Sequence, residues 1–231
     1  MLTLAFDTSS KTASVAVLRD HAVLYQTIIH KDLNHSEVLL PAIDEACRLS
    51  GVALRQIDLF ACTLGPGSFT GLRIGVGTLK GLMMATGKPA AGVSTLAALA
   101  LNVEQKDKII GSMMDAGRGQ VYLAYYRYDP NGLLQQMESE RALNPQSLSD
   151  DDKDQVIYVG DGAIKYAGLI PSLASKKNKL APAGQQFISA SAVGILAIEK
   201  YHRHDVLDLA RCVPVYLRSV DALPKKPTMA L

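Results

Sequence analysis

The chain has 231 residues, 48% of them hydrophobic, and its 24 Lys and Arg nearly balance its 22 Asp and Glu. A net charge of +2 argues against the broadly basic surface of a protein that binds nucleic acid tightly by itself, so we expect any RNA contact to be shared with a partner. Three scattered cysteines without a CxxC pair argue against a disulfide framework or a zinc knuckle. The first residues lack the cationic start and long apolar core of a signal peptide, and no later apolar run reaches about 20 residues, so we expect neither export nor a membrane span. We therefore predict a cytoplasmic protein without membrane contact.

The first hundred residues predict a three-stranded meander followed by alternating helices and strands. The expected strands cover residues 2–7, 12–18, 22–29, 57–63 and 90–93, and the expected helices cover residues 36–50, 70–85 and 95–101. Pro41 should kink the first helix or lie in its first turn, and Gly87 should end the second helix. The polar run at residues 104–108 predicts a boundary between a first lobe, residues 1–104, and a second lobe, residues 105–231.

The second lobe repeats the opening of the first. Strands expected at residues 108–115 and 120–128 are again joined by an Asp and a short turn of small residues. Further strands at residues 155–160 and 178–181 and a helix at residues 189–201 follow, while residues 141–154 are predicted as a loop. The end of the stretch 213–231 is predicted as a loose tail.

Two such hairpins can face each other across a cleft, where turn amides line a phosphate and each Asp holds a metal–water shell or a hydroxyl. The superfamily of actin, hexokinase and Hsp70 binds nucleotide in this way. We therefore predict an α/β fold of two actin-like, ribonuclease H-like lobes, with a candidate nucleotide site at Asp7, Thr8, Ser9, Asp115 and Gly117. The alternative is that Asp7 and Asp115 only cap their turns through their own side chains.

The helix at residues 70–85 is unusually rich in glycine. Gly71, Gly75, Gly77 and Gly81 each cost about 1 kcal/mol relative to Ala in a helix interior. Gly71 and Gly75 share one face of the helix and Gly77 and Gly81 share another, so a neighbour can approach closely along both. Either the chain covers one face and a partner covers the other, or the monomer covers both. Ser68 or Thr70 is expected to cap this helix, because the preceding loop lacks the Gly-Lys-Ser/Thr ending of a phosphate-binding P-loop.

Motifs of catalysis and metal binding are missing from the sequence. The five histidines form no HExxH arrangement, and His35, His202 and His204 are expected to cap helix ends or face solvent. The sequence contains no Gly-x-Ser-x-Gly elbow and no Cys with a neighbouring His. We therefore predict no catalytic residues and no metal site.

Several motifs together resemble the TsaB family, also called YeaZ. They are Asp7-Thr8-Ser9, His35-Ser36-Glu37 with Leu39-Leu40-Pro41, the block Gly65-Pro66-Gly67-Ser68-Phe69-Thr70-Gly71, Asp115-Ala116-Gly117-Arg118, and Tyr216-Leu217-Arg218. The likeness covers nearly the whole chain and is densest in the first hundred residues.

The resemblance implies an actin-like, inactive paralogue that binds and activates TsaD, the threonylcarbamoyl transferase acting on the adenosine beside the anticodon of certain tRNAs. The small ATPase TsaE joins them, and tRNA contact is expected only through the complex. In TsaD, two metal-binding histidines follow the corresponding helix and strand, whereas this chain has Val93-Ser94-Thr95-Leu96-Ala97-Ala98-Leu99 there, without an imidazole or carboxylate. We expect no cofactor of its own, with ATP or ADP as a candidate at the boundary with TsaD.

The helices at residues 36–50 and 70–85 are the predicted partner surface, for TsaD or for a second copy when TsaD is absent. Its predicted residues are Leu39, Ile43, Thr70, Gly71, Ile74, Gly75, Thr78 and Leu82. Two other functions stay open at this stage: an autonomous ATPase or phosphotransferase using Asp7 and Asp115, and a metallopeptidase.

Overall fold

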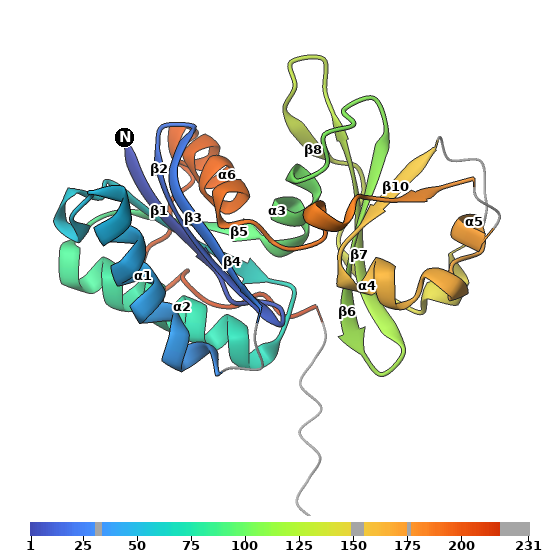
Figure 1. Ribbon diagram of the computed structural model, residues 1–231, viewed down its shortest axis with the longest axis horizontal. Coiled ribbons are helices and arrows are strands. Elements are labelled where there is room, and N and C mark those ends of the chain that lie inside the picture. The colour runs from blue at the N-terminus through green and yellow to red at the C-terminus, as the bar shows by residue number, and fades with distance from the viewer. Residues whose placement is uncertain (31–33, 149–154, 175–176, 218–231) are drawn as a thin grey trace, which may run out of the picture.

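The structure, a computed structural model, describes residues 1–30, 34–148, 155–174 and 177–217. Two lobes lie side by side, each built on one β-sheet with helices against it (Figure 1). The elements of the first half are β1 (Leu2–Asp7), β2 (Thr12–Arg19), β3 (Ala22–His30), α1 (His35–Ser50), β4 (Leu59–Gly65), α2 (Phe69–Thr86), β5 (Ala90–Ser94) and α3 (Thr95–Leu101). Those of the second half are β6 (Ile109–Gly117), β7 (Gln120–Tyr128), β8 (Leu134–Gln136), β9 (Arg141–Leu143), β10 (Val156–Val159), α4 (Asp161–Lys165), α5 (Pro171–Ala174), β11 (Lys179–Leu180) and α6 (Ala190–His202).

The two sheets share a strand plan. In the first sheet the order is β3-β2-β1-β4-β5, with antiparallel pairing through β3, β2 and β1 and parallel pairing through β1, β4 and β5. In the second sheet the order is β11-β10-β6-β7-β8, with β9 also on β7, and the hairpin β6–β7 again continues into parallel strands. The predicted repeat of the opening hairpin is therefore confirmed.

Buried side chains form layers on both faces of each sheet. Helices α1 and α2 cover one face of the first sheet over a core that includes Leu4, Phe6 and Phe60. The opposite face packs on α6 and α3, and this core continues into the second lobe through Leu99 and Met114. Because one closely packed core joins the lobes, the residues at the base of the cleft between them are held in place.

Most predicted elements are present with boundaries shifted by one or two residues. Ser68 caps α2 by accepting from the Gly71 amide at 3.2 Å, and Gly87 ends it in a left-handed conformation. Pro41 lies inside α1 beyond its first turn. The expected loop at residues 141–154 is wrong for its first residues, which form β9 and a short 3-10 helix, Pro145–Ser147.

The end of the chain packs differently from the predicted division at residue 105. Helix α6 lies against β1 and β2 of the first sheet, on the face opposite α1 and α2 (Figure 1). The following segment stays with the first lobe, since the Leu207 amide donates to the Ala90 carbonyl at 2.7 Å and the Val215 amide donates to the Leu64 carbonyl at 2.7 Å. The predicted loose tail falls mainly on residues 218–231, outside the described residues.

Candidate functional site

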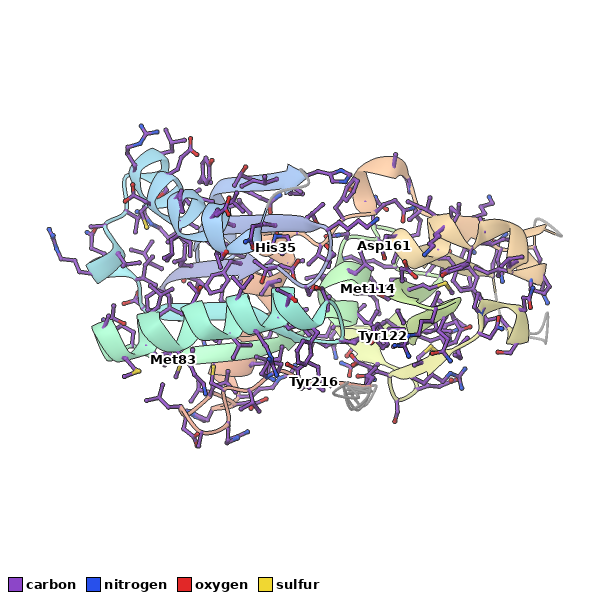
Figure 2. The ribbon with its side chains drawn as sticks, turned by 90° about the horizontal axis from the view of Figure 1, so that it is seen from below. His35, Met83, Met114, Tyr122, Asp161 and Tyr216 are labelled. Carbon is purple, nitrogen blue, oxygen red and sulfur yellow. The ribbon has the colours of Figure 1, made fainter. Side chains whose placement is uncertain are left out.

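The turns of the two opening hairpins border a cleft between the lobes. Ser9, Ser10 and Lys11 of the first turn and Asp115 to Arg118 of the second line its wider part, of about 620 Å³. A narrower part of about 340 Å³ continues past Thr12, Leu99 and Gln186. Figure 2 shows Met114, Tyr122, Asp161 and Tyr216 gathered where the lobes meet. The predicted cleft between Asp-containing turns therefore exists.

The Asp of the first turn does not reach this cleft. Asp7 is 0% exposed, and its Oδ1 accepts from the Ser9 amide at 3.1 Å, the Ser9 hydroxyl at 2.6 Å and the Thr63 hydroxyl at 2.5 Å. Burial raises the pKa of Asp7, although these hydrogen bonds oppose the shift. The bond to the amide two residues on is an Asx turn, so Asp7 caps its own turn, as the alternative interpretation expected.

The glycine-rich block packs over the first turn. The Ser68 amide donates to the Ser9 carbonyl at 2.7 Å, and a methyl group at Gly67 would overlap that same carbonyl. Thr8 is 2% exposed and donates to the Gly71 carbonyl at 2.8 Å. The prediction of a phosphate site at Asp7, Thr8 and Ser9 therefore needs correction, because residues of the glycine-rich block cover the place at this turn where a phosphate would bind. Of the three predicted residues, Ser9 alone lines the cleft.

The second turn remains at the cleft. Asp115 accepts from the Gly117 amide at 3.0 Å, the Tyr166 hydroxyl at 3.0 Å and the Lys165 ammonium at 2.6 Å. Burial alone would raise the pKa of Asp115, but Lys165 and the two other donors outweigh it and hold the pKa below its usual value. Asp115 therefore caps its turn and is charge-paired, and Gly117 stands beside it at the cleft.

Asp161 is a cleft residue that the sequence analysis missed. It begins α4, accepts from the Asp115 amide at 3.0 Å, and has a pKa raised by burial and, to a lesser extent, by the charge of Asp115. Gly160 and Gly162 flank it, and side chains there would collide with the backbone of β6. A strand followed by Gly-Asp-Gly was the signal that could have identified this site.

His35 also differs from expectation. It is the first residue of α1, and its Nε2 lies 2.8 Å from the Ser10 carbonyl, so it supports the first turn. The exposure expected for His202 and His204 is confirmed. Among residues 1–30, 34–148, 155–174 and 177–217, no three His, Cys, Asp or Glu side chains group where they could hold a metal ion.

Helix α2 has two different glycine faces. A methyl group at Gly71 would overlap the Thr8 carbonyl, and one at Gly75 would lie 2.6 Å from the Thr8 hydroxyl oxygen. A methyl group at Gly77 or Gly81 would meet no other described element within 4 Å. The described residues therefore cover the first face and leave the second uncovered.

The open side of α2 is called the outer glycine face below. Its residues are Thr70, Ile74, Gly77, Thr78, Gly81 and Met84. Met84 is 73% exposed, whereas Met83 packs in the core. The predicted partner surface is corrected in part. Leu39, Gly71 and Gly75 belong to the interior of the chain, whereas Ile43 and Leu82 are largely buried but line an open hollow of about 580 Å³ beside α1. Thr70, Ile74 and Thr78 stay accessible.

Similarity to known proteins follows this architecture. The TsaD family model, described as tRNA N6-adenosine threonylcarbamoyltransferase, matches residues 30–163, more than half of the chain. A relative from Bacillus subtilis named tRNA threonylcarbamoyladenosine biosynthesis protein TsaB is 32% identical over 97% of this chain and 97% of its own length. The chain belongs to the TsaB family. An Escherichia coli relative with the same name is 30% identical over 98% of this chain and 99% of its own length.

Solved structures agree with the TsaB assignment. YeaZ from Pseudomonas aeruginosa is 27% identical and has a TM-score of 0.80, covering 94% of this chain and 99% of that chain. Component A of (R)-2-hydroxyglutaryl-CoA dehydratase from Acidaminococcus fermentans has a TM-score of 0.54 at 12% identity, covering 87% of this chain and 99% of that chain, and shows the fold alone. The predicted two-lobed actin-like α/β fold is confirmed.

Residues 93–99 form the end of β5 and the start of α3. The resemblance to the TsaB family sets this segment against the place of the metal-binding histidines in TsaD. Ser94 caps α3 by accepting from the Ala97 amide at 3.2 Å and donates to the Glu140 carboxylate. The structure thus brings a carboxylate to a place where the local sequence has none. Burial raises the pKa of Glu140, and Tyr126 also contacts it, so these three side chains form a polar link between α3 and the second sheet.

In the part of the chain that the structure describes, no helix is both long enough and apolar enough to cross a bilayer.

Proposed function

We propose that this TsaB-family chain is a non-catalytic scaffold that binds and activates TsaD and, with it, TsaE in tRNA threonylcarbamoyladenosine synthesis. It would act in the cytoplasm and contact tRNA only through that complex. The proposal is supported by the biosynthetic names of its full-length relatives and by the outer glycine face.

The observation that carries the proposal is the difference between the two glycine faces. Each helix-interior glycine costs about 1 kcal/mol relative to Ala. Close packing on Thr8 explains Gly71 and Gly75, because any side chain there would collide. Gly77 and Gly81 have no such reason within the described chain. A partner helix that approaches closely would supply one.

The outer glycine face suits adaptable docking. Ile74 and the exposed Met84 add apolar surface beside the glycines, and methionine fits uneven partner surfaces. In the absence of TsaD, the same face would pair two copies of the chain. The proposal also keeps ATP or ADP as a candidate ligand at the boundary with TsaD. The cleft between the lobes is open, and Asp7 does not line it.

An autonomous ATPase is less well supported than a scaffold. That activity would need Asp7 beside the phosphates, whereas Asp7 is fully buried and its Oδ1 already accepts hydrogen bonds from Ser9 and Thr63. A metallopeptidase would need a metal site, and the described residues offer no ligand group for one.

Reconstitution tests the scaffold role. Modification of tRNA is measured with TsaD and TsaE, with and without this chain. We expect modification to require the chain, and the Asp7→Asn variant to support it as well as the wild type does. Full activity without the chain would contradict the scaffold role. ATP hydrolysis by the chain alone that disappears in Asp7→Asn would instead favour the ATPase.

A further inference from the structure

The two sheets differ in how their outer edges are protected against pairing with another strand. The first sheet is covered at β5 by the segment after α6, because the Leu207 amide donates to the Ala90 carbonyl at 2.7 Å and the two residues form a β-bridge. The second sheet ends in β8, β9 and β11, strands of three, three and two residues, which are too short to receive another strand. Among the described strands, β3 alone is a long outer strand, with nine residues (Figure 1).

The open side of β3 has the properties of an edge that pairs with a further strand. The strand contains no Lys, Arg, Asp, Glu or Pro, the residues with which proteins usually block an open edge. Val23 and Ile28 are 48% and 39% exposed. Leu24 has no register partner on β2, so it forms a bulge, and the regular part of the edge is residues 25–30. Within the described residues, β3 pairs with β2 and with no other strand.

The strand is held in place from both faces of the sheet. Tyr25 and Ile29 pack on the core beneath α1. At the start of α6, the side-chain carbonyl of Gln26 accepts from the Ser189 hydroxyl at 2.8 Å and from the Ser191 amide at 3.0 Å. The strand is therefore ordered before another strand arrives, which lowers the entropic cost of pairing with it.

We propose that β3 pairs antiparallel with β3 of a second copy of this chain, so that the first sheets of two copies form one continuous sheet. A two-fold axis at Thr27 sets Tyr25 of one copy opposite Ile29 of the other, and Thr27 opposite Thr27. An aromatic residue with a β-branched one, and Thr with Thr, are favourable cross-strand pairs. Because the strand has no Lys, Arg, Asp or Glu, no like charges of these types face each other. The strand is therefore complementary to itself.

This contact is separate from the outer glycine face. Helix α2 packs on β4, whereas α1 packs on β2 and β3, so α1 lies between α2 and the edge at β3. A TsaD molecule on the outer glycine face would therefore leave the edge free. One pair of strands is smaller than a stable interface of about 1,600 Å², so we expect a dissociation constant in the micromolar range.

Cross-linking between copies tests the two-fold axis at Thr27. In the paired strands the thiols of Thr27→Cys would face each other, whereas those of the matched control Val23→Cys, on the same strand, would lie roughly 25 Å apart. Both variants carry Cys47→Ser, since Cys47 is half-buried and the other two cysteines are buried. Both also carry Gly81→Glu, which blocks pairing through the outer glycine face. A short bis-maleimide should link copies of Thr27→Cys and leave Val23→Cys unlinked.

Sedimentation equilibrium gives a second measurement that needs no added thiol. Ile28 would lie opposite Gln26 of the other copy, so Ile28→Lys brings two ammonium groups to one face of the joined strands. In the Gly81→Glu chain, Ile28→Lys should weaken dimer formation by roughly tenfold or more. Leu169→Lys is the matched control, because it adds the same charge at an apolar residue of the second lobe that is 45% exposed, and it should leave the dimer unchanged.

The outcomes decide between β3 and other contacts. Cross-linking of Thr27→Cys but not of Val23→Cys, together with a dimer that Ile28→Lys alone weakens, supports pairing through β3. Equal cross-linking of the two variants, equal weakening by Ile28→Lys and Leu169→Lys, or a monomer up to millimolar concentration in the Gly81→Glu chain would overturn the proposal. TsaD binding is measured in a separate experiment, so either proposal can fail while the other stands.

Discussion

Two alanine substitutions in the same helix should change stability in opposite directions. At Gly71, the new methyl group would sit closer to the Thr8 carbonyl oxygen than the 3.0 Å that Cβ atoms keep, and this oxygen belongs to the backbone, which cannot rotate away as a side chain would. Such overpacking costs about 1–3 kcal/mol. At Gly77 there is space, so Ala should stabilise the helix by about 0.5–1 kcal/mol. For a chain of this size, Gly71→Ala should lower the Tm by roughly 2–12 °C, while Gly77→Ala should raise it by about 1–4 °C.

Thermal and urea unfolding of the isolated chain measure both changes. The low-concentration limit is required, because pairing of two copies through the outer glycine face would add stability that depends on concentration. Equal melting temperatures for the two variants would refute the reasoning, since the inner and outer faces of α2 would then be equivalent.

Three further predictions follow from single contacts. The pKa of Asp7 is raised in the folded state, so protonated Asp7 stabilises the fold fully below about pH 3.8, and this stability is lost as pH rises through the folded pKa. Asp7→Asn should remove this loss when the free energy of unfolding in urea is measured from about pH 4 upward. The same dependence of unfolding free energy on pH in the variant and the wild type would contradict the prediction. Replacing Lys165 with Gln should raise the pKa of Asp115, which carboxyl NMR titration measures; an unmoved pKa would mean that the ion pair is unimportant. The buried Gln186 side chain accepts a hydrogen bond from the Gly160 amide at 2.7 Å. Gln186→Leu should therefore destabilise the chain by about 2 kcal/mol and speed hydrogen exchange at the Gly160 amide. Unchanged protection of that amide from exchange would argue against the bond.

Sequence patterns predicted the regular elements of the first lobe because each has a strong period and a clear end. Ser68 and Gly87 bound α2 by local capping, which depends only on neighbouring residues. The short strands β8 and β9 have three residues each, too few for a period, so they were missed or predicted as loop.

The site was harder to predict, because its residues are brought together by packing. The sequence placed Gly71 and Gly75 on one helix face but could not tell that Thr8 covers them. Similarly, Asp7 has the local pattern of a cleft residue, and its burial depends on Thr63 from β4 and on the loop that follows. Tyr216 reaches the cleft because α6 returns the chain to the first sheet, a long-range connection with no local signal.

The most direct test of the account is a binding isotherm between this chain and TsaD. Gly81→Glu puts a charge on the outer glycine face without an internal clash, and Gly184→Glu is the matched control at another glycine with open space around it. Burying an unpaired charge in a docked helix surface should weaken binding by on the order of a hundredfold or more, while the control binds like the wild type. If Gly81→Glu remains folded and binds TsaD with wild-type affinity, the outer glycine face is not the docking surface.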